Sequence, residues 1–541
     1  MKKQWKTATM AVLCAVIAGT TLLSAGCGKK KADNNPQTLE VYIWNAGYGD
    51  QWVKPMLETF GNQKWVKEKY PEYKYDVVSN DQQNFGESRI NQGENNTIDL
   101  FFTQSVESFY GTDTLVDLTE CVFNQQVPGE DVLYKDKMID SMRESMVYTP
   151  AGEISESYYA TPWACDISGF VYNETLFKEL NLTVPNTTDE LFSMAEKVKT
   201  LKNSEYNHTY SIATTAISYM NYLFPVWWAQ YEGESEYENY WKGIDSEGVR
   251  NSSAVFSQTG RLKTLEIMQK IYTENNGYYD RASSTYDFMA GQTRMLTRDA
   301  LMMPCGDWFS NEMKELAQGL KTQGYDDTMR MMKTPIVSSI IEKTPSIKND
   351  AMLSAVISEI DAGKTAPETA GVTQKDFETV RAARGVMYSI GSVHTSAIPA
   401  ASTAKDLAVD FLRFMATDEA NTIYALNTSG GRLPFKFNLK TDAPEAYNEL
   451  MSTSKETFSM AADCSDYLTN DYASILPYYG KFALARYGGV GMLAGEYPSF
   501  ESAFISNANL TAKEVFDSTI KYWTENNNAR WNRALRNAGL L

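Results

Sequence analysis

The stretch that decides the fold runs from Tyr159 to Leu182 and reads YATPWACDISGFVYNETLFKELNL. It contains a proline–tryptophan pair at Pro162-Trp163. A pattern typical of a helix start follows shortly after the stretch. Thr187 and Glu190 have the spacing of a capping box, in which the two side chains satisfy free N–H groups at the start of a helix. An amphipathic helix is therefore expected to begin here, because apolar residues recur at helical spacing. These residues are Leu191, Met194, Ala195 and Val198.

Outward from this stretch, β-type segments alternate with helical ones. Residues 39–44 alternate in polarity and predict the first strand, residues 73–78 predict a second, and residues 98–102 predict a short buried one. Residues 405–426 repeat the helical pattern. Such alternation is typical of an α/β fold with mainly parallel sheets, whose ligand site forms from loops at the strand ends. Residues 337–383 are polar and less regular, which indicates an insertion.

Length and charge narrow the class of protein. A chain of 541 residues exceeds what one hydrophobic core supports, so two or more lobes are expected. Its formal net charge of −18 argues against nucleic acid and anionic lipid surfaces as partners. Aromatic residues make up 12% of the chain, either for additional packing or as walls for the apolar face of a sugar ring.

The N-terminus has the pattern of an export signal. Three lysines precede an apolar run from Met10 to Ala18, which is too short to span a membrane and is typical of a secretory signal peptide over residues 1–26. The segment ends in LSAGC at residues 23–27 and resembles the lipobox of bacterial lipoproteins. This resemblance implies that Cys27 carries a diacylglycerol. Residues 27–37 would then form a flexible tether, and the protein would sit on the extracytoplasmic face of the cell membrane.

The stretch from Tyr159 also resembles a known family, the family 1 extracellular solute-binding proteins, which include maltose-binding protein. The resemblance rests on Pro162-Trp163, then the acid Asp166, then Tyr172-Asn173 and a helix that ends before Pro185 and Thr187. Further segments resemble the family's motifs in the right order. They are Ile98–Phe101, Leu115–Thr119, Asp287–Gly291, Ala300–Trp308, Ser396–Pro399, Ala408–Met415 and Gly431–Pro434.

The resemblance implies an α/β, two-lobed, periplasmic-binding-protein-like fold of type II, with a ligand cleft between lobes joined by hinge strands. The first lobe would comprise residues 38–162 plus 334–440, and the second residues 163–333 plus 441–541. Pro162 and Thr334-Pro335 would lie near the crossings. The implied function is that of the binding subunit of a bacterial ABC importer, which captures a carbohydrate, in particular an oligosaccharide, for the permease subunits. We expect a monomer that needs no cofactor.

A sugar site combines aromatic faces for the apolar side of the ring with planar polar groups for its hydroxyls. By the resemblance, Trp308 would stack on the sugar and Asp166 would bind hydroxyls. Other candidates follow predicted strands or lie in segments that resemble sugar-contacting parts of the family. They are Trp44, Asn45, Gln82, Gln83, Gln104, Trp163, Tyr219, Trp227, Trp228, Asp307, Tyr478 and Tyr479.

Several alternatives stay open. The residues lack the local signatures of hydrolases and nucleotide-binding enzymes, but a pair of carboxylates acting on glycosides is not excluded by counting. A peptide or another small solute is the nearer alternative ligand, and an adhesin that holds glycans without transport is a third. His208 and His394 lie in polar sequence and are expected at the surface, with no metal-ligand spacing around them. Four cysteines without C-x-x-C spacing are expected as small buried groups: Cys121, Cys165, Cys305 and Cys464.

Overall fold

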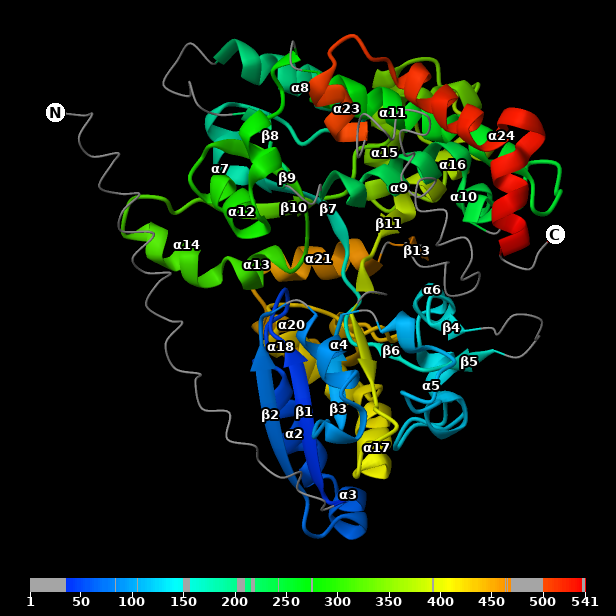
Figure 1. Ribbon diagram of the computed structural model, residues 1–541. Helices are drawn as coiled ribbons and strands as arrows, with labels where there is room; N and C mark the ends of the chain where they lie inside the picture. Colours follow the sequence, from blue (N-terminus) through cyan, green and yellow to red (C-terminus); the bar gives the residue numbers. More distant parts are fainter. Residues whose placement is uncertain are drawn as a thin grey trace.

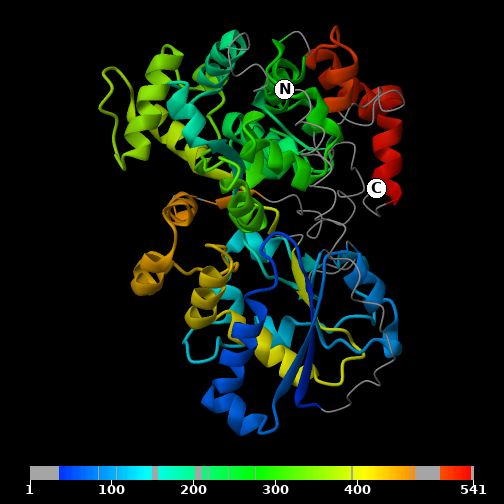
Figure 2. The same ribbon diagram turned by 90° about the vertical axis from the view of Figure 1, so that its left-hand side faces the viewer.

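The computed structural model of the protein describes residues 36–541 except residues 83, 105, 149–155, 202–209, 216–218, 242, 274–275, 392–393, 463, 465, 469–499 and 538–540. Strands and helices gather into two lobes, one below the other in Figure 1, and each lobe has its own sheet. The side view in Figure 2 shows the same division. The predicted two-lobed α/β architecture is thus observed.

The first lobe is built on a five-stranded sheet in the order β2-β1-β3-β12-β6. Its strands are β1 (Thr38–Trp44), β2 (Lys74–Asn80), β3 (Leu100–Thr103), β6 (Thr161–Pro162) and β12 (Thr395–Ala397). The three strands predicted from alternation therefore form, with ends displaced by one or two residues. β1 pairs with β2 and β3 in parallel, whereas β12 pairs antiparallel with both β3 and β6.

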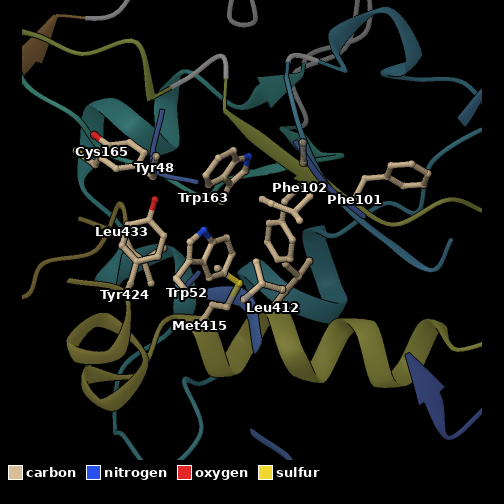
Figure 3. Packing of buried hydrophobic residues seen from close by; sticks show 14 of the residues in the cluster. Tyr48, Trp52, Phe101, Phe102, Trp163, Cys165, Leu412, Met415, Tyr424 and Leu433 are labelled. Carbon is tan, nitrogen blue, oxygen red and sulfur yellow. The ribbon is translucent and has the colours of Figure 1, made fainter. Parts of the chain in front are cut away.

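The helices of the first lobe are α2 (Val53–Asn62), α3 (Lys64–Lys69), α4 (Phe85–Ile90), α5 (Tyr134–Lys137), α6 (Asp140–Glu144), α17 (Lys405–Met415), α18 (Asp418–Asn427), α19 (Leu439–Asp442) and α20 (Pro444–Glu449). α2 and α4 contact strands of the sheet, whereas α19 and α20 pack on α18 around a smaller hydrophobic cluster. Aromatic residues fill the main core of the lobe. At the centre, the rings of Trp52 and Trp163 stack with centroids 5.9 Å apart, and Phe102 meets Trp52 edge-on (Figure 3). Such pairs contribute about 1 kcal/mol beyond the area they bury.

The second lobe contains a six-stranded sheet in the order β13-β11-β7-β9-β8, with β10 also paired to β7. Its strands are β7 (Ser168–Asn173), β8 (Tyr210–Ile212), β9 (Ala300–Gly306), β10 (Met329–Met332), β11 (Val386–Tyr388) and β13 (Asp466–Leu468). β7 runs antiparallel to β9, β10 and β11, whereas β8 pairs with β9 in parallel. The prediction of mainly parallel sheets is confirmed for the first lobe, where β12 is the strand of the five that runs opposite to the others. It is wrong for the second lobe, where β7 is antiparallel to each of its three neighbours.

The helices of the second lobe include the one expected after residue 187. The N–H of Glu190 donates to Thr187 Oγ1 at 3.1 Å, and the Glu190 carboxylate accepts from the N–H of Asn186, so the helix start forms as predicted. The helices here are α7 (Glu174–Glu179), α8 (Thr188–Leu201), α9 (Phe224–Glu232), α10 (Glu234–Trp241), α11 (Thr259–Tyr272), α12 (Phe288–Leu296), α13 (Phe309–Glu312), α14 (Lys314–Lys321), α15 (Asp350–Asp361), α16 (Gln374–Gly385), α23 (Phe500–Ser506) and α24 (Ala512–Asn537). One more helix, α21 (Ser452–Ala462), packs against β10.

In the described part of the chain, crossings between the lobes occur where β6 leads into β7, where β11 leads into β12, and between α20 and β13. The first two crossings run side by side, since the N–H of Trp163 donates to the carbonyl oxygen of His394 at 2.9 Å. The crossing predicted at Thr334-Pro335 is corrected by this topology. Residues 335–388 stay with the second lobe because α15 and α16 bury Leu353 and Phe377 in its core, and the chain returns only after β11.

All four cysteines of the folded part are expected to be buried. Cys165 and Cys305 are buried, whereas Cys121 and Cys464 are only partly buried. Within the described ranges, no helix has the length and apolar character needed to cross a membrane.

Candidate ligand-binding cleft

A cavity of about 450 Å³ lies where the two lobes face each other. The first lobe contributes Trp44, the last residue of β1, and residues that follow its parallel strands: Ala46, Gly47, Tyr48, Asp81 and Gln104. The second lobe and the second crossing supply the opposite wall: Tyr219, Tyr222, Phe288, Trp308, Glu312, Ile390 and His394. The cavity therefore sits at the carboxyl ends of β1, β2 and β3, where sites of open α/β sheets form, and its size suits a small ligand.

Aromatic rings dominate the wall from the second lobe. Tyr222 meets Trp308 edge-on with centroids 5.8 Å apart and packs beside Tyr219 at 4.8 Å. Gly306 explains how Trp308 reaches this place, because a Cβ at position 306 would collide with the indole ring. The Gly-x-Trp pattern thus has a local cause: the glycine leaves room for the ring to fold back over the end of β9.

Direct hydrogen bonds join the two lobes beside the cavity. Gly47, in the turn after β1, donates its N–H to Glu312 Oε1 at 3.1 Å and accepts from Asn311 Nδ2 at 2.9 Å. This turn needs glycine, since Gly47 has φ +62°. Nearby, the hydroxyl of Tyr48 donates to Asp307 Oδ1 at 2.5 Å. These contacts join the two lobes directly.

A buried polar cluster lies beneath these contacts at the crossings. Asp166 accepts from the N–H of Ile390 at 3.1 Å and from Ser389 Oγ at 3.0 Å, and so ties the first crossing to the second. Burial raises the pKa of both Asp166 and Asp307. Arg432, whose Nη2 lies 4.0 Å from Asp307 Oδ2, opposes this rise by its positive charge.

Two titratable side chains that line the cavity, Glu312 and His394, have pKa values shifted from their ordinary range. Burial raises the pKa of the Glu312 carboxyl to about 7, although hydrogen bonds from Gln292 Nε2 at 2.6 Å and from Gly47 stabilise its charged form. His394 stacks on Trp44 with centroids 5.6 Å apart and is 4% exposed. Burial lowers its pKa to about 4, so the ring is neutral at pH 7. The surface position expected for His394 is therefore wrong.

Of the candidates from sequence, four line the cavity: Trp44, Gln104, Tyr219 and Trp308. Asn45 and Gln82 are exposed at the ends of β1 and β2 without lining it. Asp166 and Asp307 belong to the buried cluster below, where their oxygens already accept hydrogen bonds. Outside the described residues lie Gln83, Tyr478, Tyr479, Cys27 and His208.

Three candidates are corrected because they lie in hydrophobic cores. Trp163 is fully buried against Trp52, and its Nε1 donates to the carbonyl oxygen of Thr103 at 3.0 Å. Trp227 and Trp228 are 0% and 1% exposed within the second lobe. Their helix α9 is buried along almost its whole length, which its nearly all-apolar sequence could have indicated.

Sequence reasoning missed several residues of the cavity, above all Tyr222, Phe288 and Glu312. Tyr222 stands close to the candidate Tyr219, and Phe288 lies within the segment Asp287–Gly291 that resembles a family motif, yet nothing local separates either ring from core aromatics. Glu312 lies four residues after Trp308, so one helical turn brings it to the same side of the chain. That spacing from a proposed sugar-stacking residue is the one signal that could have found it.

Comparison with known proteins supports the fold and the family. A family model described as bacterial extracellular solute-binding protein matches residues 72–451. The multiple sugar-binding protein of Streptococcus mutans is 36% identical over 59 residues, a stretch that spans 11% of this chain and only 14% of that relative.

Solved structures share the fold at low sequence identity. The GacH receptor of Streptomyces glaucescens has a TM-score of 0.54 at 12% identity, over 92% of this chain and 98% of that one. A structure from work on xylan utilisation by Caldanaerobius polysaccharolyticus has a TM-score of 0.53 at 14% identity, over 90% and 99%. A probable secreted solute-binding lipoprotein from Streptomyces coelicolor has a TM-score of 0.52 at 13% identity, over 91% and 99%. With most of the chain matched by the family model, the protein belongs to the bacterial extracellular solute-binding proteins.

Proposed function

We propose that the protein captures a carbohydrate, in particular an oligosaccharide, in the cleft and delivers it to the permease of an ABC importer. The observation that carries the proposal is the wall of Tyr219, Tyr222 and Trp308 opposite Trp44 and Gln104. Aromatic faces bind the apolar side of a pyranose, and planar amides and carboxylates bind its hydroxyls. The cavity of about 450 Å³ combines both kinds of group.

Capture takes place by closure of the two lobes about the crossings at residues 163–167 and 389–394. A ligand in the cleft contacts both lobes and therefore favours the closed state by the extra contacts it makes there. The permease distinguishes this closed form from the open one. The hydrogen bonds from Gly47 and Tyr48 to the second lobe support this proposal, because they exist only while the lobes meet.

The protein acts from the outer face of the cytoplasmic membrane, held there by a lipid on Cys27. The support is the signal-like segment, the LSAGC sequence at residues 23–27 and the polar tether behind it. A diacylated cysteine supplies the two acyl chains that stable anchoring requires. Extracellular action agrees with the family to which the chain belongs.

The named ligands of relatives support the carbohydrate class. The GacH receptor has been solved in complex with acarbose and an acarbose homolog. The S. mutans relative carries the name multiple sugar-binding protein. Both are statements about those proteins, and the aromatic lining of this cleft is the feature that extends them to this chain.

A thermal-shift screen with purified protein tests the proposal, using mono- and oligosaccharides beside peptides and inorganic anions. A ligand at a concentration of a hundred times its Kd adds about 2.7 kcal/mol to the free energy of unfolding. For a protein of this size, that corresponds to a rise in Tm of a few degrees. We expect stabilisation by one class of carbohydrate, confirmed by calorimetry. Stabilisation by a peptide or an anion with none by any carbohydrate would contradict the proposed ligand class.

A further inference from the structure

The charged side chains that line the cleft are all acidic. Asp81 and Glu312 line the cavity, and no lysine or arginine is found among its described lining residues. His394, which also lines it, is neutral because burial lowers its pKa to about 4. A ligand with a carboxylate or phosphate would therefore meet negative charge without a compensating cation, whereas a positive ligand would meet attraction.

Glu312 is held in one orientation by uncharged donors. Its Oε1 accepts the N–H of Gly47 at 3.1 Å and its Oε2 accepts Gln292 Nε2 at 2.6 Å. Across the part of the chain that the structure describes, no lysine, arginine or histidine forms an ion pair with it. Each carboxylate oxygen can accept a second hydrogen bond, so the fixed carboxylate retains acceptor capacity for a ligand.

A partly buried carboxylate without a counter-charge is unfavourable, which is why burial raises the pKa of Glu312 to about 7. An ammonium group on the ligand would supply the missing charge and strengthen the hydrogen bond. The rings around it act in the same sense, because the faces of Trp44, Tyr222 and Trp308 attract cations. The net charge of −18 also raises the local concentration of cations.

We propose that the preferred ligand is a basic carbohydrate, one with a free protonated amino group, and that this ammonium pairs with Glu312. The inference rests on the proposed function, since it names the class of carbohydrate that the same cleft binds. A neutral sugar fills the aromatic walls but leaves the carboxylate without a partner charge. An acidic sugar adds a repulsion that no described lining residue relieves.

Calorimetry on the purified wild-type protein tests this with matched oligosaccharide pairs that differ only by an amino group in place of one ring hydroxyl. Glucosamine, galactosamine and mannosamine series with their neutral counterparts cover the main stereochemistries, and uronic-acid oligomers form the acidic arm. We expect the tightest ligand to be an amino sugar, bound about tenfold or more tightly than its neutral counterpart. A neutral or acidic member that binds as tightly as any amino sugar would overturn the inference and leave the proposed function standing. Absence of carbohydrate binding would contradict the proposed function itself.

The variant Glu312→Gln tests whether the Glu312 carboxylate is the group that pairs with the ammonium of the ligand. The amide oxygen that this variant introduces can still accept the hydrogen bond from the N–H of Gly47. Oε1 of Gln292 has no hydrogen-bond partner among the described residues. The side chain of Gln292 can therefore turn so that this oxygen accepts from the new amide nitrogen. We expect the preference for the amino sugar to fall to about threefold or less, with the neutral counterpart bound as before. Glu315→Gln removes the same charge at an exposed position outside the cavity lining and should keep the preference. Retained preference in Glu312→Gln, or its loss in Glu315→Gln alone, would overturn the assignment.

Discussion

The hydroxyl of Tyr48 donates a 2.5 Å hydrogen bond to Oδ1 of Asp307, and this bond connects the turn after β1 with the end of β9. The two residues lie 259 positions apart and belong to opposite lobes. Tyr48 is 1% exposed, and it packs on His394 and Tyr424. Because the bond joins the two lobes, we expect it to contribute to the closing equilibrium rather than to the stability of either lobe alone.

Removing this hydroxyl should weaken ligand binding. In Tyr48→Phe the ring packing remains, but closure loses about 1 kcal/mol, which corresponds to about a fivefold increase in Kd. Calorimetry measures the affinity, and small-angle scattering should find a larger radius of gyration for the ligand-free variant. Tyr75→Phe is the matched control, since its exposed hydroxyl bonds Glu58 within the first lobe. Equal Kd values for Tyr48→Phe and the wild type would rule out this role.

Trp308 should provide a large share of the carbohydrate affinity. Trp308→Ala removes a ring that lines the cavity, and the loss of about 2 to 3 kcal/mol of apolar contact predicts a Kd raised about a hundredfold. The control is Trp241→Ala, because Trp241 is also 4% exposed but lies in the core of the second lobe. Both variants should lose stability, and only the first should lose affinity. A similar affinity loss in both would mean that Trp308 acts through packing.

Acid should stabilise the ligand-free protein through Glu312. Its pKa is raised from 4.5 to about 7, so its stabilising contribution is full below pH 4.5 and is lost as the pH rises to about 7. The free energy at stake is at most about 3 kcal/mol. Thermal unfolding from pH 5 to 8 should give a steeper fall of Tm for the wild type than for Glu312→Gln. Asp166 and Asp307 are present in both proteins, so parallel curves would show that Glu312 does not titrate in this range.

Membrane attachment should depend on Cys27. In Cys27→Ala no thiol remains for a lipid, and the polar tether that follows offers no apolar surface of its own. We expect the variant in the soluble fraction or the medium and the wild type in the membrane pellet after fractionation. Cys121→Ala, which changes a partly buried thiol of the folded part, should stay in the pellet. A Cys27→Ala protein that still sediments with membranes would contradict lipid anchoring.

Residues of the cavity differ in whether local sequence or long-range packing places them there. Trp44 and Gln104 could be found from sequence because the ends of parallel strands converge, whatever the rest of the chain does. Tyr222 and Glu312 could not, because their place in the cavity depends on how the second lobe packs against the first. Asp166 is expected from the resemblance to bind ligand hydroxyls, whereas its oxygens accept hydrogen bonds from Ser389 and Ile390 and join the two crossings.

The lobe boundary was misplaced for a related reason. Thr334-Pro335 has the local character of a turn, but turns do not reveal which core the following residues enter. The helices after it bury Leu353, Val356 and Phe377 against the second lobe, and β11 then adds to the second sheet. Only the pairing of β11 with β7 and β13 reveals that the chain has not yet crossed.

Arg261 is 0% exposed in the second lobe. Its Nη1 donates to the carbonyl oxygen of Phe256 at 3.2 Å, whereas Nε and Nη2 have no hydrogen-bond partner among the described residues. Burial lowers the pKa of the guanidinium to about 10, which indicates a destabilised charge. Arg261→Met keeps much of the side-chain volume and removes that charge, so the free energy of unfolding should rise by about 1 to 3 kcal/mol.

Arg384 provides the contrast for this measurement. It is also buried, but its Nε and Nη2 form hydrogen bonds with the Asp361 carboxylate at 3.1 and 2.7 Å. Arg384→Met leaves Asp361 without this partner and should therefore destabilise the protein by about 3 kcal/mol or more. Denaturant unfolding of the two variants should shift the midpoint in opposite directions. If Arg261→Met destabilises as strongly as Arg384→Met, the contact with Phe516 and the packing of the arginine stem outweigh the cost of its charge.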